Sequence, residues 1–278
     1  MNKTITELLD AMWRDYLELA PDARSIHQLF ASLNGGGVIN DHIALRTYNL
    51  DKVSIDQIAR PFLEAGYQEG GEYRFPARKL YAKHFSPPDT KLPKVFISEL
   101  LTEQLSDSAQ DIIQKLVDQV ENSALLKDSF CCSGRPWNIG LDDYDRLLEE
   151  SEYAAWVAAF GYRPNHFTVS INHLQSHDDI DELNRLLQDE GYRLNETGGL
   201  VKGSADVLLE QSATLAGEVS VSFSDGTREI PGCFYEFAKR YPQADGQLYQ
   251  GFVAASADKI FASTDTATGQ FRVNRGGV

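Results

Sequence analysis

The stretch DHIALRT (residues 41–47) has a counterpart later in the chain, NHFTV (residues 165–169). In both, a polar residue and a histidine open a run of alternating and β-branched residues, which is typical of a strand. A predicted helix follows each run and leads to a Gly-Tyr pair, in EAGY (64–67) and DEGY (189–192), whose glycine lies 24 or 25 residues after the histidine. The repeat predicts a duplicated fold that brings the two histidines to one site, and two convergent imidazoles usually indicate a metal.

Each copy is predicted to be a β-α-β-β-β module. In the first copy we expect strands at 42–48, 67–75, 80–85 and 94–98, with a helix at 54–65. In the second copy we expect strands from His166 onward and at 207–214, 219–223 and 233–238, with a helix capped by Ser176 or Asp178 and ending at Glu190. The predicted fold class is therefore α+β, with a central curved, barrel-like mixed sheet and surrounding helices.

The two modules are expected to form one catalytic domain, residues 1–278, with three additional parts. Apolar residues at helical spacing predict N-terminal helices, and a second mainly helical region, broken at 132–136, could be a lid or a packing layer. The C-terminal part contains a further helix or lid. In order, the parts are 1–40, the first module 41–100, the helical insertion 101–160, the second module 161–240 and the C-terminal segment 241–278.

Composition excludes some function classes. The net charge of −15 argues against binding to nucleic acids or anionic membranes, because both need basic faces. No apolar run approaches the length of a membrane span and the N-terminus lacks an apolar signal core, so we expect a cytoplasmic protein. Cys131, Cys132 and Cys233 are expected to be reduced thiols, because adjacent cysteines pair only with strain.

His42 and His166 are the candidate metal ligands. Two imidazoles and one carboxylate on one face of an ion leave positions open for a substrate, as in non-haem Fe(II) oxygenases. Glu236 is the expected carboxylate, because it lies in the apolar run CFYEF (233–237), where burying an unpaired charge is costly. Simpler interpretations stay open: either histidine could be structural, and Glu236 could face solvent or pair with Arg240.

Arg46 lies four residues after His42, so strand alternation points both side chains to one face. A guanidinium beside a metal suits a substrate carboxylate, although a surface salt bridge is the more common role of an arginine. Gln211 and Ser212, which are polar residues in an otherwise apolar strand, are expected to contact substrate or a metal-bound water. The remaining histidines are weaker candidates: His84 could line the cavity, and His27, His173 and His177 are expected to be structural or solvated.

Several motifs together resemble the 2-oxoadipate dioxygenase/decarboxylase family. They are DHIALRT, NHFT (165–168), LEQS (209–212), FYEF (234–237) and a C-terminal GF (251–252) with SADKIF (256–261). The resemblance implies a fold of the vicinal-oxygen-chelate type and an Fe(II) enzyme of lysine breakdown. It also implies that His42, His166 and Glu236 bind the metal, that Arg46 holds a substrate carboxylate, and that Ser256 belongs to the substrate pocket.

The implied reaction converts 2-oxoadipate, or a related 2-oxo acid, and O2 to 2-hydroxyglutarate and CO2. No protein partner is evident from the sequence. Two alternatives stay open. One is a metal-dependent lyase, isomerase or hydrolase acting on a small carboxylate with Zn, Ni or Mn at the same ligands, because one fold hosts many chemistries. The other is a non-catalytic protein that binds a small ligand, although such a protein would not need the three ligands together with Arg46.

Overall fold

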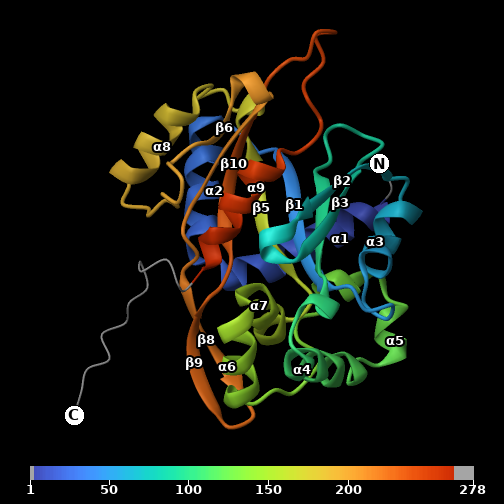
Figure 1. Ribbon diagram of the computed structural model, residues 1–278. Coiled ribbons are helices and arrows are strands. Elements are labelled where there is room, and N and C mark those ends of the chain that lie inside the picture. The colour runs from blue at the N-terminus through green and yellow to red at the C-terminus, as the bar shows by residue number, and fades with distance from the viewer. Residues whose placement is uncertain (1–2, 266–278) are drawn as a thin grey trace, which may run out of the picture.

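A computed structural model describes residues 3–265 of the chain. Its centre is an eight-stranded sheet with the order β2-β3-β4-β1-β5-β10-β7-β6 (Figure 1). The strands of the first module are β1 (Asn40–Tyr48), β2 (Gln68–Phe75), β3 (Leu80–Ser86) and β4 (Lys94–Leu100). Those of the second are β5 (Pro164–Ser170), β6 (Lys202–Ser204), β7 (Leu209–Ala213) and β10 (Phe234–Arg240).

The sheet has two halves with the same internal order. In each half the first strand runs parallel to the last strand of its module, β1 to β4 and β5 to β10, and the remaining pairs are antiparallel. The halves meet where β1 pairs antiparallel with β5. The predicted duplication, the α+β class and the mixed sheet are therefore confirmed.

The first module matches its prediction closely, with the helix α3 (Ile55–Glu64) between β1 and β2. In the second module, the helix α8 (Ile180–Asp189) begins after Asp179, whose side chain accepts hydrogen bonds from the backbone N–H groups of Asp181 and Glu182. The predicted caps, Ser176 and Asp178, were therefore wrong, by one residue for Asp178. Asp179 directly precedes the helix, and only from that position does a carboxylate reach the unpaired backbone N–H groups of the first turn.

Two strand predictions in the second module need correction. The region 207–214 contains only β7, because a left-handed residue, Leu208, ends a 3-10 turn directly before it. The predicted strand at 219–223 is β8 (Glu218–Phe223), but it pairs only with β9 (Gly226–Pro231) in a separate hairpin. Phe223 packs against Tyr144 at a ring distance of 5.0 Å, so the apolar side of this hairpin is buried outside the sheet.

Helices cover the convex side and one end of the sheet (Figure 1). The predicted N-terminal helices are present as α1 (Lys3–Leu19) and α2 (Pro21–Leu33), which pack on β5 and β10 respectively. The insertion contains α4 (Asp107–Asp118), α5 (Asn122–Leu125), α6 (Leu141–Glu150) and α7 (Glu152–Phe160). After its first residue, Glu152, every residue of α7 is buried, so this helix is part of the core rather than a lid.

The C-terminal helix α9 (Ala254–Ile260) lies against the concave side of the sheet. It contacts β2 near one edge of the sheet and β6 and β7 near the other, which is possible only because the sheet curves around it. A 3-10 turn, Phe261–Thr264, follows. The curved sheet and α9 together enclose the space in which the candidate site lies.

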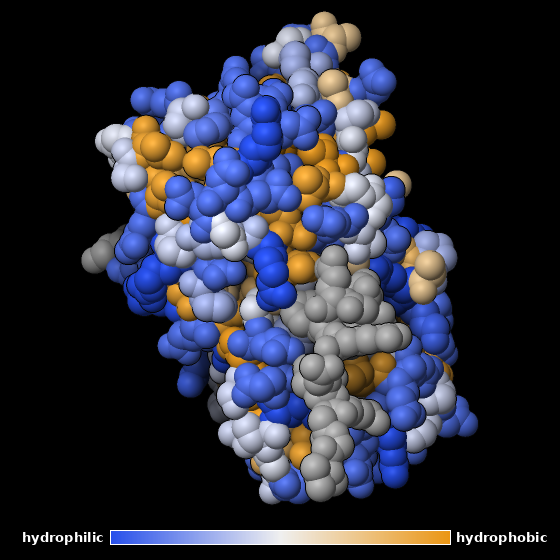
Figure 2. Space-filling view, turned by 90° about the vertical axis from the view of Figure 1, so that its left-hand side faces the viewer, coloured by the Kyte–Doolittle hydropathy of each residue, from blue (hydrophilic) through white to orange (hydrophobic). Residues whose placement is uncertain are grey.

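The molecular surface agrees with the composition. The face in Figure 2 is mainly hydrophilic, with apolar residues between the polar ones. Within residues 3–265, no helix combines the length and the apolar character that a membrane span requires. Cys131, Cys132 and Cys233 are free thiols, as predicted.

Candidate metal centre and adjoining pocket

The three predicted ligands come together on neighbouring strands. His42 of β1 is paired with Thr168 of β5, and Thr168 is paired with Glu236 of β10. Residues that are directly paired across strands point to the same face, so His42 and Glu236 lie on one side of the sheet. His166, two residues before Thr168, points to this face as well.

The ligand atoms are close enough to share one ion. Nε2 of His42 lies 3.4 Å from Oε1 of Glu236, and Nε2 of His166 lies 3.1 Å from Oε2 of the same carboxylate. All three ligand atoms lie within 4.8 Å of one another, and the three side chains are buried. Metal–ligand distances of about 2.0–2.2 Å put adjacent donors roughly 3 Å apart, so these separations suit a divalent cation.

The protonation of the two imidazoles also favours a cation. Nδ1 of His42 lies 2.9 Å from Oδ1 of Asp41, and Nδ1 of His166 lies 3.1 Å from Oδ1 of Asn165. If Nδ1 of each ring donates to these oxygens, each Nε2 presents a lone pair to the carboxylate of Glu236. Oε2 of Glu236 accordingly has no hydrogen-bond donor among residues 3–265, and a metal ion is the natural partner for this set of buried acceptors.

Electrostatics keeps the ligands in their metal-binding forms. Burial by itself would raise the pKa of Glu236, but His42, His166 and the hydrogen bond from Gln211 outweigh burial and lower it. Nε2 of Gln211 donates to Oε1 of Glu236 at 2.6 Å. Burial lowers the pKa of His166. The site therefore combines a charged carboxylate with a neutral imidazole, which are the forms that bind metals.

Asp41 is held by a buried arginine at the other end of β10. Nε and Nη2 of Arg240 donate to the two oxygens of Asp41 at 2.6 and 2.8 Å. Burial by itself would raise the pKa of Asp41, but Arg240 and His42 outweigh it and hold it well below its usual range. Of the alternatives for Glu236, pairing with Arg240 is thus excluded, because the guanidinium is already bound to Asp41.

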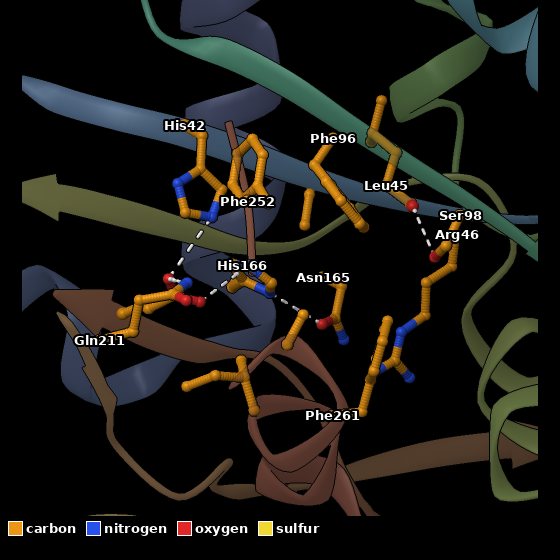
Figure 3. Close-up of a pocket in the computed structure, with 14 residues that line it drawn as sticks. His42, Leu45, Arg46, Phe96, Ser98, Asn165, His166, Gln211, Phe252 and Phe261 are labelled. Carbon is orange, nitrogen blue, oxygen red and sulfur yellow. Dashed lines mark hydrogen bonds and ion pairs between the residues drawn. The ribbon is translucent and has the colours of Figure 1, made fainter. Parts of the chain in front are cut away.

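A pocket adjoins the metal centre and contains Arg46. Its polar lining residues beyond the three ligands are Arg46, Ser98, Asn165 and Gln211, and its apolar wall includes Leu45, Phe96, Phe252, Ile260 and Phe261. The close-up in Figure 3 shows His42 and Gln211 at one end of this pocket and Arg46 at the other. The arrangement offers a cation-binding centre at one end and a fixed positive charge at the other.

Arg46 is a buried cation among aromatic rings. Its guanidinium lies 4.9 Å from the ring centroid of Trp156 and 5.1 Å from that of Tyr153, both on α7. Nη2 donates to the hydroxyl of Thr264, and Nε has no hydrogen-bond partner within the described part of the chain, residues 3–265. Burial lowers the pKa of Arg46 to about 10, so the group stays protonated at neutral pH. The burial of Arg46 excludes the surface salt bridge, and its buried Nε favours an anionic ligand.

Ser212 and Ser256 do not reach the pocket. Ser212 alternates with Gln211 along β7, so its hydroxyl faces the other side of the sheet and donates to Asn184 of α8 at 2.7 Å. Ser256 on α9 is buried near Gly203 of β6, and only its neighbour Ala257 lines the pocket. We therefore leave both serines out of the candidate site.

The other histidines are outside the group of ligands. His84 is buried, and its Nδ1 lies 2.9 Å from the hydroxyl of Tyr73. Burial, assisted by Lys94 and Arg240, lowers the pKa of His84 to about 4, so it is neutral near pH 7. His27 contacts the hydroxyl of Tyr235, and His173 and His177 contact serine hydroxyls.

Sequence reasoning missed Asp41, Asn165, Arg240 and Phe252 as parts of the site. The ring of Phe252 covers His42 at a centroid distance of 4.8 Å. Asp41 and Asn165 were recognisable, because an oxygen-bearing side chain precedes the histidine in both copies of the motif. The role of Arg240 had no local signal, because its partner lies 199 residues away.

Comparisons with known proteins agree with this geometry. The family model described as 2-oxoadipate dioxygenase/decarboxylase matches residues 4–130 and 115–246. A protein of that name from Arabidopsis thaliana, described as chloroplastic, is 37% identical over 92% of this chain and 76% of its own length. The rice hydroxyglutarate synthase, solved in complex with 2-oxoadipate, is 36% identical with a TM-score of 0.87, over 94% of this chain and 92% of that one.

Two further solved structures resemble this chain. A Shewanella frigidimarina protein, provisionally described as a hydrolase, is 54% identical with a TM-score of 0.88, over 92% of this chain and 100% of that one. A glyoxalase-superfamily protein from Ralstonia eutropha is 24% identical with a TM-score of 0.69, over 89% of this chain and 85% of that one, and shares the fold. The glyoxalase likeness confirms the predicted vicinal-oxygen-chelate type of fold.

Proposed function

Because the chain belongs to the 2-oxoadipate dioxygenase/decarboxylase family, we propose that it is an Fe(II)-dependent enzyme that converts 2-oxoadipate and O2 to 2-hydroxyglutarate and CO2. The observation that carries the proposal is the buried group of His42, His166 and Glu236, with Arg46 in the same pocket. Consumption of 2-oxoadipate would be a step of lysine breakdown. The cytoplasmic location expected from the sequence stays a prediction.

His42, His166 and Glu236 would hold the iron, and Gln211 would fix the orientation of Glu236 through its hydrogen bond. Three ligands on one face leave positions for a 2-oxo acid and for dioxygen. Bound Fe(II) would supply the redox chemistry that couples decarboxylation of the 2-oxo acid to the reduction of O2. The protein side chains orient the substrate and exclude water.

Arg46 would bind the carboxylate farther from the metal. The rise of about 3.3 Å per residue along a strand puts the backbone positions of His42 and Arg46 about 13 Å apart. A 2-oxo acid bound to the metal by its oxo-acid end would therefore direct its other end toward Arg46. Within residues 3–265 the Nε of Arg46 has no hydrogen-bond partner, so it is available to donate to a carboxylate.

The apolar wall would hold the methylene chain between the two charged ends. Phe96, Phe252 and Phe261 line the pocket, and Phe252 also covers His42. A closed apolar wall strengthens the interactions of the carboxylates with Arg46 and the metal, because little water remains to screen them.

The decisive experiment is to load the protein with Fe(II) without oxygen and then add 2-oxoadipate and a known amount of O2. The expected result is uptake of O2, with one CO2 and one 2-hydroxyglutarate formed for each 2-oxoadipate consumed. No uptake by protein shown to contain iron would refute the proposal. Turnover of a small carboxylate without O2 would instead support the lyase, isomerase or hydrolase alternative.

A further inference from the structure

Asn165 has a hydrogen-bond donor for which residues 3–265 supply no acceptor. Its Oδ1 faces Nδ1 of His166 at 3.1 Å, while its Nδ2 is buried and has no partner. Asn165 is 1% exposed, so water does not solvate this NH2 group freely. The residue lines the pocket beside the metal centre. A buried donor without a partner is costly, and a ligand in the pocket would remove that cost.

The corresponding residue of the other repeat does not share this property. Asp41 also precedes a ligand histidine, but its two oxygens are occupied by His42 and Arg240. The duplicated position therefore carries two different groups. The carboxylate of Asp41 is used entirely within the protein, whereas the amide of Asn165 keeps one end available.

The orientation of the Asn165 amide follows from metal binding, and this step rests on the proposed function. If His166 binds the metal through Nε2, its Nδ1 carries the proton and needs an acceptor. The oxygen of Asn165 must then face His166, and the NH2 group must point the other way. Figure 3 shows this arrangement, with the amide nitrogen turned away from the metal centre toward the side of the pocket where Arg46 lies.

We propose that Asn165 is a substrate-binding residue whose Nδ2, together with Nε of Arg46, donates to the far carboxylate of a 2-oxo diacid. Both nitrogens are buried donors without a partner in the described structure, and both residues line the same pocket. Two donors that converge on one carboxylate distinguish a diacid from a 2-oxo acid with an apolar end, because only the diacid satisfies both. Asn165 thus orients His166 with one end of its amide and selects the substrate with the other.

The test is the substitution Asn165→Asp, which keeps an oxygen for Nδ1 of His166 and removes the donor. Dissociation constants of 2-oxoadipate and 2-oxohexanoate, which lacks the far carboxylate, would be measured with Ni(II)-loaded protein, together with its metal content. We expect the preference for 2-oxoadipate over 2-oxohexanoate to fall by roughly 10- to 100-fold, the range for a lost hydrogen bond to a charged group. Metal content should not fall, because an oxygen still faces Nδ1 of His166.

Two outcomes would overturn the proposal. An unchanged preference would show that Nδ2 does not contact the far carboxylate. An equal loss of affinity for both acids would show that Asn165 acts only at the metal-bound end or through His166. Because binding to Ni(II)-loaded protein needs no turnover, the result is independent of the oxygen-uptake experiment, whose failure would refute the proposed reaction instead.

Asn184→Asp is the matched control. Asn184 is also a buried asparagine with a partnerless Nδ2, but its Oδ1 accepts from Ser212 and it does not line the pocket. The same chemical change there should leave the preference between the two acids unaltered. If thermal unfolding shows that Asn165→Asp does not fold, Asn165→Ala replaces it. The readout is the ratio of the dissociation constants of the two acids, so any loss of affinity that is common to both acids cancels.

Discussion

Arg46 shows how one residue acquires a function from its neighbours. The guanidinium is surrounded by the rings of Tyr153, Trp156 and Phe261, which accept a cation on their faces without neutralising its charge. Its Nη2 donates to an uncharged hydroxyl, that of Thr264. The positive charge therefore remains available to a substrate anion.

At this scale we predict that Arg46→Ala raises the KM for 2-oxoadipate by roughly 10- to 100-fold or more, because a charged hydrogen-bonding partner is lost. Iron content should change little, because Arg46 is not a ligand. Steady-state kinetics and metal analysis of the same preparation check this. Arg46→Lys is the control that keeps the charge but loses the planar donor pair, and it should recover only part of the affinity. A parallel loss of iron and of substrate affinity would show that Arg46 is structural.

Among the elements, Arg240 connects β10 to β1 and to the C-terminal segment. Its Nε and Nη2 donate to Asp41, and its Nη1 donates to the backbone carbonyls of Tyr249 and Gly251 at 2.9 and 2.7 Å. Gly251 directly precedes Phe252, the ring over His42. The guanidinium of Arg240 thus holds Asp41, which orients His42, and also holds the segment whose Phe252 covers His42.

We predict that Asp41→Asn lowers metal affinity by roughly 10- to 100-fold, because the partner that orients His42 loses its charge. It should also destabilise the fold by about 3–5 kcal/mol, because Arg240 is left as a buried charge without an ion pair. Chelator competition and chemical unfolding measure the two effects. Asp145→Asn is the control: it weakens the exposed pair with Arg228, and should cost less than about 1 kcal/mol and leave metal affinity unchanged. Unaltered metal binding in Asp41→Asn would contradict this role.

For the whole molecule, the important feature is that the candidate metal centre joins the two repeats. His42 belongs to the first half of the sheet, whereas His166 and Glu236 belong to the second. A bound ion would link the halves across the β1–β5 junction. Binding would then stabilise the native state and not the unfolded chain, where the ligands are dispersed.

We predict that a divalent ion at 100 times its dissociation constant stabilises the protein by about 2.7 kcal/mol, and that a chelator removes this gain. Glu236→Ala should keep the cooperative unfolding of the metal-free protein but lose the stabilisation by metal. Calorimetry with and without metal, together with metal analysis, checks both statements. Glu210→Ala removes a carboxylate outside the ligand group, which bonds the hydroxyl of Tyr241, and should keep the full stabilisation by metal. Unchanged iron content in Glu236→Ala would refute its role as a ligand.

The sequence by itself determined the repeat, most of the strands and helices and the three candidate ligands. These features are encoded locally, since strand alternation fixes which residues share a face, and a glutamate in an apolar run signals a buried charge that needs a partner. The histidine at the start of each repeat therefore predicted a shared site before any long-range contact was known.

Tertiary structure alone decided the rest. Gln211 and Ser212 are adjacent, so only one of them can face the site, and the pairing of β7 with β10 selects Gln211. The separation of β8 from the sheet depends on its packing against the helical insertion. The pairing of Arg240 with Asp41 and the free donor of Asn165 depend on contacts between distant segments. Such contacts leave no periodic signal, because their energy arises only when the folded chain excludes water from both partners.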